Sequence, residues 1–290
     1  MGIRKYTVVG GDLRNVKLAN LIMADGNEVN LYGFKNAGFE LGINENTDLK
    51  EAIDDSDIVI GPLPCSNDNE TVNAPFHPNK IYINEVFKTM KKNQLFIAGR
   101  ISDKIIHLAE AYKVYCIDIL EREEMAVLNA IPTAEGAIQI AMEEMATTLH
   151  DCKALVLGFG RIGKILAKML QGIGVKVFVE ARKYSDIAWI KSYGYKPVYL
   201  NELGDYLGQM DVIFNTIPHI ILDVNMLGKL KSECLVIDLA SKPGGVDFER
   251  AKAMGIKVIW ALSLPGKVAP ITAAKFIKET VYNIIEELGV

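Results

Sequence analysis

The residues best suited to chemistry are three glycines, Gly158, Gly160 and Gly163, which stand in G-x-G-x-x-G spacing directly after the apolar run KALVL. Gly158 permits a tight turn, Gly160 lets the backbone approach a pyrophosphate, and Gly163 allows the following helix to lie close to the strand. The start of that helix offers N–H donors to a phosphate. This segment therefore predicts a dinucleotide-binding turn.

An acidic residue stands where this fingerprint requires one. Glu180 ends the next apolar run, about 20 residues after Gly158, where a ribose-binding carboxylate is expected. Residues 158–164 also fit most of a P-loop, but Ile165 stands where Ser or Thr would hold magnesium. We therefore predict a dinucleotide site and not a site for a nucleoside triphosphate.

The residues around Glu180 bear on the choice between NAD and NADP. Glu180 can accept a hydrogen bond from a ribose 2′-hydroxyl, as NAD binding requires. Arg182 and Lys183 can instead neutralise a 2′-phosphate, and a carboxylate beside that phosphate would be repelled. We expect NADP, with Glu180 turned aside, and NAD remains the alternative.

Three later segments of the same half are also expected around the cofactor, because ligands of parallel sheets bind beyond the carboxyl ends of the strands. These segments are residues 215–218, 238–241 and 264–266. The complete expected cofactor set is Gly158, Phe159, Gly160, Arg161, Ile162, Gly163, Glu180, Ala181, Arg182, Lys183, Asn215, Thr216, Ile217, Pro218, Asp238, Leu239, Ala240, Ser241, Leu264, Pro265 and Gly266.

Other residues are candidates for binding an anionic substrate. Lys242 could meet a substrate carboxylate, although the Pro-Gly-Gly that follows it is also ordinary turn chemistry. Arg14 could clamp a carboxylate, whereas Asp12 is expected to cap a helix. Ser66 lies in a polar loop with donors enough for a dicarboxylate, although such loops are usually only solvated.

Short β-branched runs alternate with longer helical patterns along the whole chain, which is typical of parallel βαβ units. We predict an α/β fold of two doubly wound Rossmann-like units with an inter-domain cleft. Residues 1–130 would form a substrate and catalytic domain and residues 131–270 the cofactor domain. The predicted strands lie near 5–10, 29–34, 57–61, 95–98, 114–117, 153–158, 175–180, 211–215, 234–239 and 257–260.

Two amphipathic helices are expected to join these units. Residues 131–150 carry apolar residues at three- and four-residue spacing and predict a bridging helix. We expect Thr133 and Glu135 to open this helix beside the cleft, so that Glu135 is either a base or a first-turn acid favoured by the helix dipole. Residues 271–290 predict a second helix, which we expect to pack back on the first domain.

Composition narrows the class of function. The chain has 290 residues, of which 50% are hydrophobic, and a net charge of −4, which favours globular domains over a nucleic-acid-binding surface. Four cysteines without C-x-x-C and four histidines without ligand spacing predict no metal site. No apolar run reaches the ~18 residues of a membrane span, and no secretory signal is visible, so we expect a cytoplasmic protein.

A set of ordered segments indicates a family: VVGGDLRN, LEREEMAVLNAIPTAEG, GFGRIG, NTIPH, IDLASKPGG and LPGKVAPITA. Over nearly the whole chain, these segments resemble the A subunit family of dipicolinate synthase, from endospore-forming bacteria. The resemblance implies NADP-linked oxidation of dihydrodipicolinate to dipicolinate during sporulation, in the mother-cell cytoplasm. It also implies a small dicarboxylate substrate and, as the partner, a flavoprotein-like B subunit. We expect a homo-oligomer as well.

Two other functions remain open. A D-2-hydroxyacid dehydrogenase shares this architecture, but that family uses a late histidine with an acid, and this chain has no histidine after His219. Lys242 also stands where that family has an arginine, and alanine dehydrogenase resembles the chain by fold only. The second alternative is a noncatalytic NADP-binding subunit that supports a partner enzyme.

Overall fold

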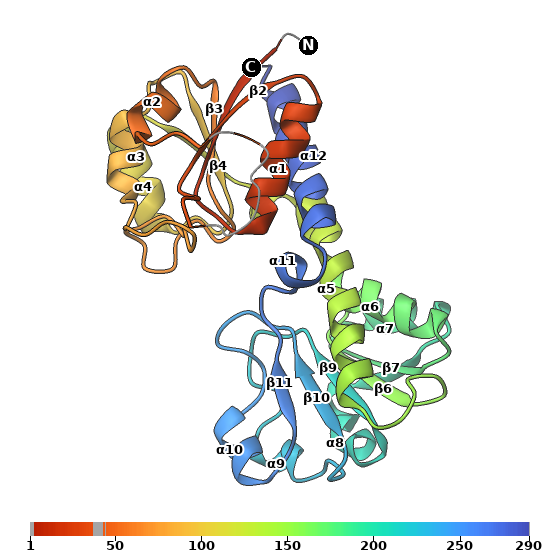
Figure 1. Cartoon of the computed structure of the whole chain (residues 1–290). Coiled ribbons are helices and arrows are strands. Elements are labelled where there is room, and N and C mark those ends of the chain that lie inside the picture. The colour runs from red at the N-terminus through yellow and green to blue at the C-terminus, as the bar shows by residue number, and fades with distance from the viewer. Residues whose placement is uncertain (1–2, 37–42, 44, 290) are drawn as a thin grey trace. The chain divides into compact units, whose positions relative to one another are not determined.

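The computed structural model describes residues 3–36, 43 and 45–289. The chain divides into two compact units (Figure 1). Unit 1 consists of Met1–Leu128 together with Ala269–Val290, and unit 2 of Asn129–Val268. Both units are parallel sheets covered by helices on both faces, so the predicted α/β class and the two Rossmann-like units are confirmed.

Unit 1 is built on a five-stranded sheet with the order β2-β1-β3-β4-β5. The chain reverses its direction of travel across the sheet between β1 and β3, which makes this the topological switch point, where ligands of such sheets bind. The strands of this sheet are buried at its centre, where apolar runs lie between helices on both faces, and only partly buried at its two edges. They are β1 (Lys5–Val9), β2 (Glu28–Tyr32), β3 (Ile58–Ile60), β4 (Leu95–Ala98) and β5 (Tyr115–Asp118), close to the predicted ranges.

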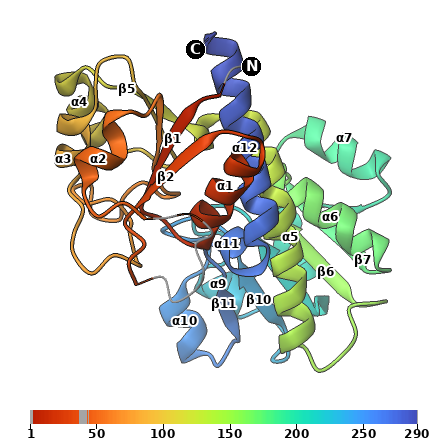
Figure 2. The same ribbon diagram turned by 45° about the horizontal axis from the view of Figure 1, so that its top comes forward.

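Helices from both ends of the chain cover one face of this sheet. α1 (Leu13–Ala24) and α12 (Pro270–Leu288) lie side by side, as Figures 1 and 2 show. Ala274, Ile277, Val281 and Ile284 of α12 are buried against the sheet and α1, whereas Leu288 near its end is exposed. The opposite face is covered by α2 (Leu49–Asp54), α3 (Ile83–Thr89) and α4 (Asp103–Tyr112).

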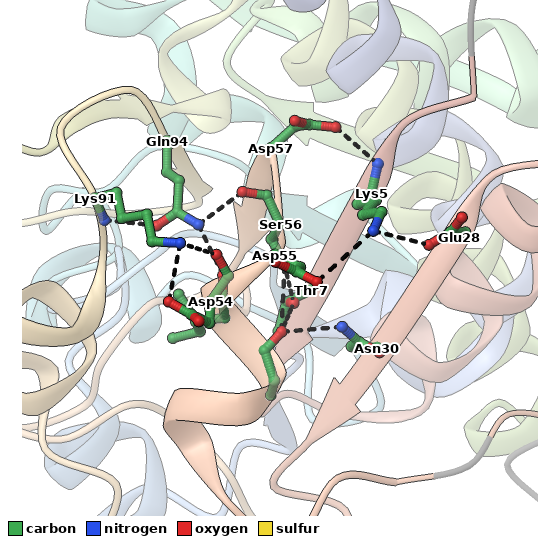
Figure 3. A network of polar contacts seen from close by, with 12 residues as sticks. Lys5, Thr7, Glu28, Asn30, Asp54, Asp55, Ser56, Asp57, Lys91 and Gln94 are labelled. Carbon is green, nitrogen blue, oxygen red and sulfur yellow. Dashed lines mark hydrogen bonds and ion pairs between the residues drawn. The ribbon is translucent and has the colours of Figure 1, made fainter.

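A buried polar network ties α2 to the strands of unit 1 (Figure 3). The hydroxyls of Thr7 and Ser56 contact each other, and Thr7 also donates to the carbonyl of Ala52. The Gln94 amide donates to the carbonyls of Ile53 and Ser56, each at 2.7 Å. These polar groups are satisfied within the protein, so the network is structural.

Unit 2 is built on a six-stranded sheet with the order β11-β10-β9-β6-β7-β8, the arrangement of dinucleotide-binding folds, with its switch point between β6 and β9. β8 was not predicted, because its four residues include Pro197, and proline fits only an edge strand. The strands are β6 (Lys153–Leu157), β7 (Lys176–Ala181), β8 (Lys196–Tyr199), β9 (Val212–Asn215), β10 (Leu235–Asp238) and β11 (Val258–Trp260).

The helices of unit 2 also form two layers. One face carries α5 (Glu123–Glu144), α6 (Arg161–Gly172) and α7 (Tyr184–Ser192), and a short helix, α11 (Leu264–Val268), packs on α5 near Gly136. The other face carries α8 (Leu203–Tyr206), α9 (Val224–Leu227) and α10 (Phe248–Ala253). Within the described residues, no helix combines the length and apolar character of a membrane span.

The bridging helix begins earlier than predicted. α5 starts at Glu123 and contains Pro132, so Thr133 and Glu135 lie in its middle and do not open it. The expectation that Glu135 is a first-turn acid is therefore wrong, and the acids of the first turn are Glu123 and Glu124. The helix continues through Pro132 because it has buried apolar residues both before and after the proline. Met125 belongs to one hydrophobic core cluster, and Ala134, Ala137 and Ala141 belong to another.

Candidate functional site

The glycine-rich turn lies between β6 and α6, and its backbone needs glycine. Gly158 has a φ of +90°, which L side chains rarely adopt, and its N–H donates to the Glu180 carbonyl at 3.2 Å. A Cβ on Gly163 would lie 2.1 Å from the carbonyl oxygen of Gly158. These two glycines therefore let α6 start directly against the end of β6.

Gly160 differs from the other two glycines because it faces open space. It is the N-cap of α6 and supplies no side-chain cap, and a Cβ added there would meet no protein atom within 4 Å. The first N–H groups of a helix attract anions such as a phosphate. The space in front of Gly160 therefore fits the pyrophosphate of a dinucleotide.

Glu180 ends β7 beside this turn. Its side chain is only 1% exposed, and its Oε1 atom has no hydrogen-bond partner. Burial raises the pKa of the Glu180 carboxyl, against the opposing effects of the Gly158 N–H and the positive charge of Arg182. A buried polar atom without a partner is unusual, and a ribose hydroxyl at the predicted position would supply one. The residues present therefore fit a dinucleotide.

Arg182 and Lys183 follow β7, and both are exposed. Within the described part of the chain, neither side chain forms an ion pair. Their two positive charges therefore remain available to a phosphate near Glu180.

Asn215 and Asp238 were expected to line the cofactor, but their side chains are fully buried and bonded within the protein. Asp238 Oδ1 accepts from Asn215 Nδ2 at 2.8 Å and from the Ala240 N–H at 3.0 Å, and its Oδ2 accepts from the Gly245 N–H at 2.8 Å. Asn215 also donates to the Ile217 carbonyl at 3.0 Å. Both side chains therefore position the loops after β9 and β10.

The neighbouring expected residues lie on these same loops. The Thr216 hydroxyl donates to the Leu157 carbonyl at 2.8 Å, so it also braces the turn. Ser241 and Lys242 are exposed. The segment from Leu264 to Gly266 begins the short helix α11, with Leu264 and Pro265 buried.

Arg14, the proposed carboxylate clamp, is engaged inside unit 1. Its side chain is 9% exposed, its Nε and Nη2 atoms bond the Asp12 carboxylate at 2.8–3.1 Å, and Nη2 also donates to the Leu63 carbonyl. Asp12 caps α1 as predicted, accepting from the Arg14 N–H at 2.9 Å. These bonds give Arg14 a structural role.

Ser66 and Thr133 are likewise bonded to their own surroundings. Ser66 donates to Asp68 at 3.1 Å and accepts from the Asn69 N–H at 2.9 Å, which closes a turn. The buried Thr133 hydroxyl donates to the Asn129 carbonyl at 2.8 Å within α5. The local hydrogen bonds therefore account for both hydroxyls, and Glu135 is exposed.

The loop after β3, where Ser66 was predicted to help bind a dicarboxylate, encloses a polar cavity whose His77 and Lys80 the sequence analysis did not single out. Its volume is about 280 Å³, and its lining includes His77, Lys80, Asn67 and Asn73. The available signal was the segment 67–80, which holds four asparagines, a histidine and a lysine after a buried strand. Among the described residues, no cluster of His, Cys, Asp or Glu could hold a metal ion.

Comparison with protein families divides the chain in two. A family described as the N-terminal domain of the dipicolinate synthase A subunit matches residues 5–120. A family described as "D-isomer specific 2-hydroxyacid dehydrogenase, NAD binding domain" matches residues 120–243, which contain the glycine-rich turn and Glu180. Unit 2 is therefore built on an NAD-binding domain of the oxidoreductase type, whose cofactor is a nicotinamide dinucleotide.

Full-length relatives match across both units of the chain. The A subunit of dipicolinate synthase from Bacillus subtilis is 30% identical over 98% of this chain and 96% of its own length. The crystal structure of the same subunit from Bacillus halodurans matches with a TM-score of 0.88 and 28% identity, over 98% of this chain and 99% of that chain. A transhydrogenase from Sinorhizobium meliloti shares the fold, with a TM-score of 0.69 and 15% identity over 97% and 94% of the two chains.

Proposed function

Since the chain belongs to the A subunit family of dipicolinate synthase, we propose that it oxidises dihydrodipicolinate to dipicolinate with NADP for spore formation. The observation that carries this proposal is the buried, unpartnered Glu180 Oε1 atom beside the glycine-rich turn, because a ribose hydroxyl of a bound dinucleotide, the 3′-hydroxyl in NADP, would supply its missing donor. The full-length similarity supports the choice of substrate.

The reaction balances without a further oxidant. Dihydrodipicolinate and NADP⁺ give dipicolinate, NADPH and one proton: a ring carbon loses a hydride, a second ring position loses a proton, and the ring becomes aromatic. When bound, the nicotinamide accepts the hydride. Because aromatisation supplies much of the driving force, the protein mainly has to hold the two rings in register.

The residues of unit 2 suit this positioning role. The N–H groups at the start of α6 would bind the pyrophosphate, and Gly160 leaves room for it. Asp238 and Asn215 hold the loops after β9 and β10 rigid, so that the site needs little reorganisation. Lys242, exposed on the second of these loops, would pair with a substrate carboxylate.

NADP is the proposed cofactor because two unpaired cations follow β7. Arg182 and Lys183 would neutralise the 2′-phosphate.

Two further proposals come from the family. The relatives are named as an A subunit, which supports the existence of a partner chain, and we propose the flavoprotein-like B subunit for this role. We place the complex in the mother-cell cytoplasm. The predicted homo-oligomer and the predicted inter-domain cleft remain proposals.

One assay tests the function. The purified chain receives NADP and dihydrodipicolinate generated in situ, with and without the B subunit, and both NADPH and pyridine dicarboxylate are measured. We expect equal amounts of the two products from the chain alone. Turnover only with the B subunit would indicate instead that this chain is a noncatalytic subunit or that the two subunits share one active site. No turnover in either case would refute the proposed reaction.

A further inference from the structure

We propose that the polar cavity in the loop between β3 and α3 binds a carboxylate of the substrate through Lys80 and His77. The cavity has a volume of about 280 Å³ and lies wholly within unit 1. The identity of its ligand as a small dicarboxylate rests on the proposed function. The site itself is argued from its place in the sheet, its rigidity and its charge.

The cavity lies at the switch point of the unit 1 sheet. The loop that lines it is bonded to the carboxyl end of β1, where the Gly11 N–H donates to the Asn73 carbonyl at 2.9 Å. It also meets the end of β2, because the Tyr32 ring lies 5.5 Å from the His77 ring. Since β3 leads into the loop, three strand ends converge here, and such convergence is where doubly wound sheets bind ligands.

The loop is held in place by its own backbone. The Val72 N–H donates to the Ile81 carbonyl at 2.8 Å, and the Asn73 N–H donates to the Cys65 carbonyl at 2.9 Å. A Cβ on Gly10 would lie 2.9 Å from Val72 and 3.0 Å from Ala74, so the glycine lets the loop sit directly on the end of β1. The cavity is therefore preorganised, which lowers the entropic cost of binding.

The lining carries positive charge and hydrogen-bond donors but no acid. Lys80 is exposed and forms no ion pair within the described residues. The His77 Nδ1 atom lies 2.8 Å from the Asn79 carbonyl, which can only accept, so Nδ1 donates there, and Nε2 can donate to a carboxylate when the ring carries both protons. An anion is the ligand that this lining favours.

The acids of the same loop are occupied elsewhere. Asp68 accepts two bonds from Thr71, at its N–H and its hydroxyl, each at 2.8 Å. Glu70 pairs with Lys104 at 3.1 Å. Neither acid therefore neutralises Lys80 directly. The volume lies just below the range of about 300 to 1,000 Å³ typical of drug-sized ligands, which suits one small ring with carboxylates.

Pyridine-2,6-dicarboxylate is the probe that tests this site, by calorimetric titration of the full chain with and without NADP. We expect Lys80→Ala and His77→Gln each to weaken its binding by about tenfold, which corresponds to about 1.4 kcal/mol, with NADP affinity unchanged. Lys88→Ala, on α3, and His107→Gln, exposed on α4, are the matched controls and should stay within about twofold of wild type.

The outcomes separate this site from the reaction. If the wild type turns over but both variants bind and turn over normally, the cavity is not the carboxylate site and the proposed function stands. If the dicarboxylate binds, the variants lose it and no turnover occurs, the site stands and the proposed reaction fails. Absence of any dicarboxylate binding by the wild type would overturn the inference. Unchanged melting temperatures would show that both variants are folded.

Discussion

Replacing Gly160 by alanine would separate the folding of the glycine-rich turn from its capacity to hold a cofactor. The added methyl would meet no protein atom within 4 Å, and the φ of −80° at this residue is one that alanine adopts. Alanine is a poorer N-cap than glycine, so we expect a loss of less than about 1 kcal/mol in the free energy of unfolding. The fold should therefore survive the change.

The same Gly160→Ala change should weaken cofactor binding. In this fingerprint the pyrophosphate lies against the backbone of the second glycine, so the methyl would take the ligand's space. We expect NADP to bind about tenfold to hundredfold more weakly, which corresponds to about 1.4 to 2.8 kcal/mol. Fluorescence titration with NADPH measures this loss, and urea denaturation without cofactor measures stability.

Two other glycines of α6 serve as comparisons. Gly172→Ala, near the end of the helix, also meets nothing within 4 Å and should change neither stability nor affinity by much. Gly163→Ala should lower both the stability and the NADPH affinity, because its Cβ would lie 2.1 Å from a carbonyl oxygen. The expected loss of stability is about 1–3 kcal/mol. Wild-type NADPH affinity in the Gly160→Ala variant would refute the placement of the pyrophosphate.

Three further predictions follow from particular residues. Arg182→Ala should weaken NADP binding by about tenfold and leave NAD binding unchanged, as parallel titrations would show, and equal effects on the two cofactors would contradict the NADP assignment. Burial raises the pKa of Glu180 in the folded state, so the stability of the cofactor-free protein should fall as pH rises from the carboxyl's ordinary pKa through this raised value. Glu180→Gln should flatten the curve of melting temperature against pH. Parallel curves for the variant and the wild type would contradict the shift. Gln94→Ala removes one donor from each of the Ile53 and Ser56 carbonyls and the acceptor of the Lys91 N–H, and it should cost about 2–4 kcal/mol by urea denaturation. The exposed Gln139→Ala should cost almost nothing, and similar values for the two variants would contradict a structural role for the network.

Most of the fold could be predicted from local pattern. Ten of the strands were found near their observed positions, most of them because buried parallel strands are continuous apolar runs. β8 escaped because Lys196 and Pro197 interrupt its pattern, and only pairing with β7 makes it a strand. The start of α5 was misplaced because proline is common at the first position of a helix, and Pro132 stands where the helix was predicted to begin. The helix continues across Pro132 because apolar residues on both sides of the proline are packed in the core.

The candidate site was predictable only where its chemistry depends on neighbours in the sequence. The glycines after β6 and the acid at the end of β7 are a local requirement of the turn and of parallel pairing, so their spacing alone identified them. Arg14, by contrast, is a suitable carboxylate ligand by type alone. Its actual partners include the carbonyl of Leu63, which the fold brings to it from a distant loop.

The amino-acid sequence by itself determined the α/β class, the dinucleotide fingerprint and the family resemblance, because each depends on residue types at short, regular spacing. Only the tertiary structure decided which polar side chains remain available to a ligand. It joined Asn215 to Asp238 from neighbouring strands and left the Oε1 atom of Glu180 buried without a hydrogen-bond partner. The physical reason is that a buried polar group must be satisfied, and the atoms that satisfy it are chosen by the packing of distant segments.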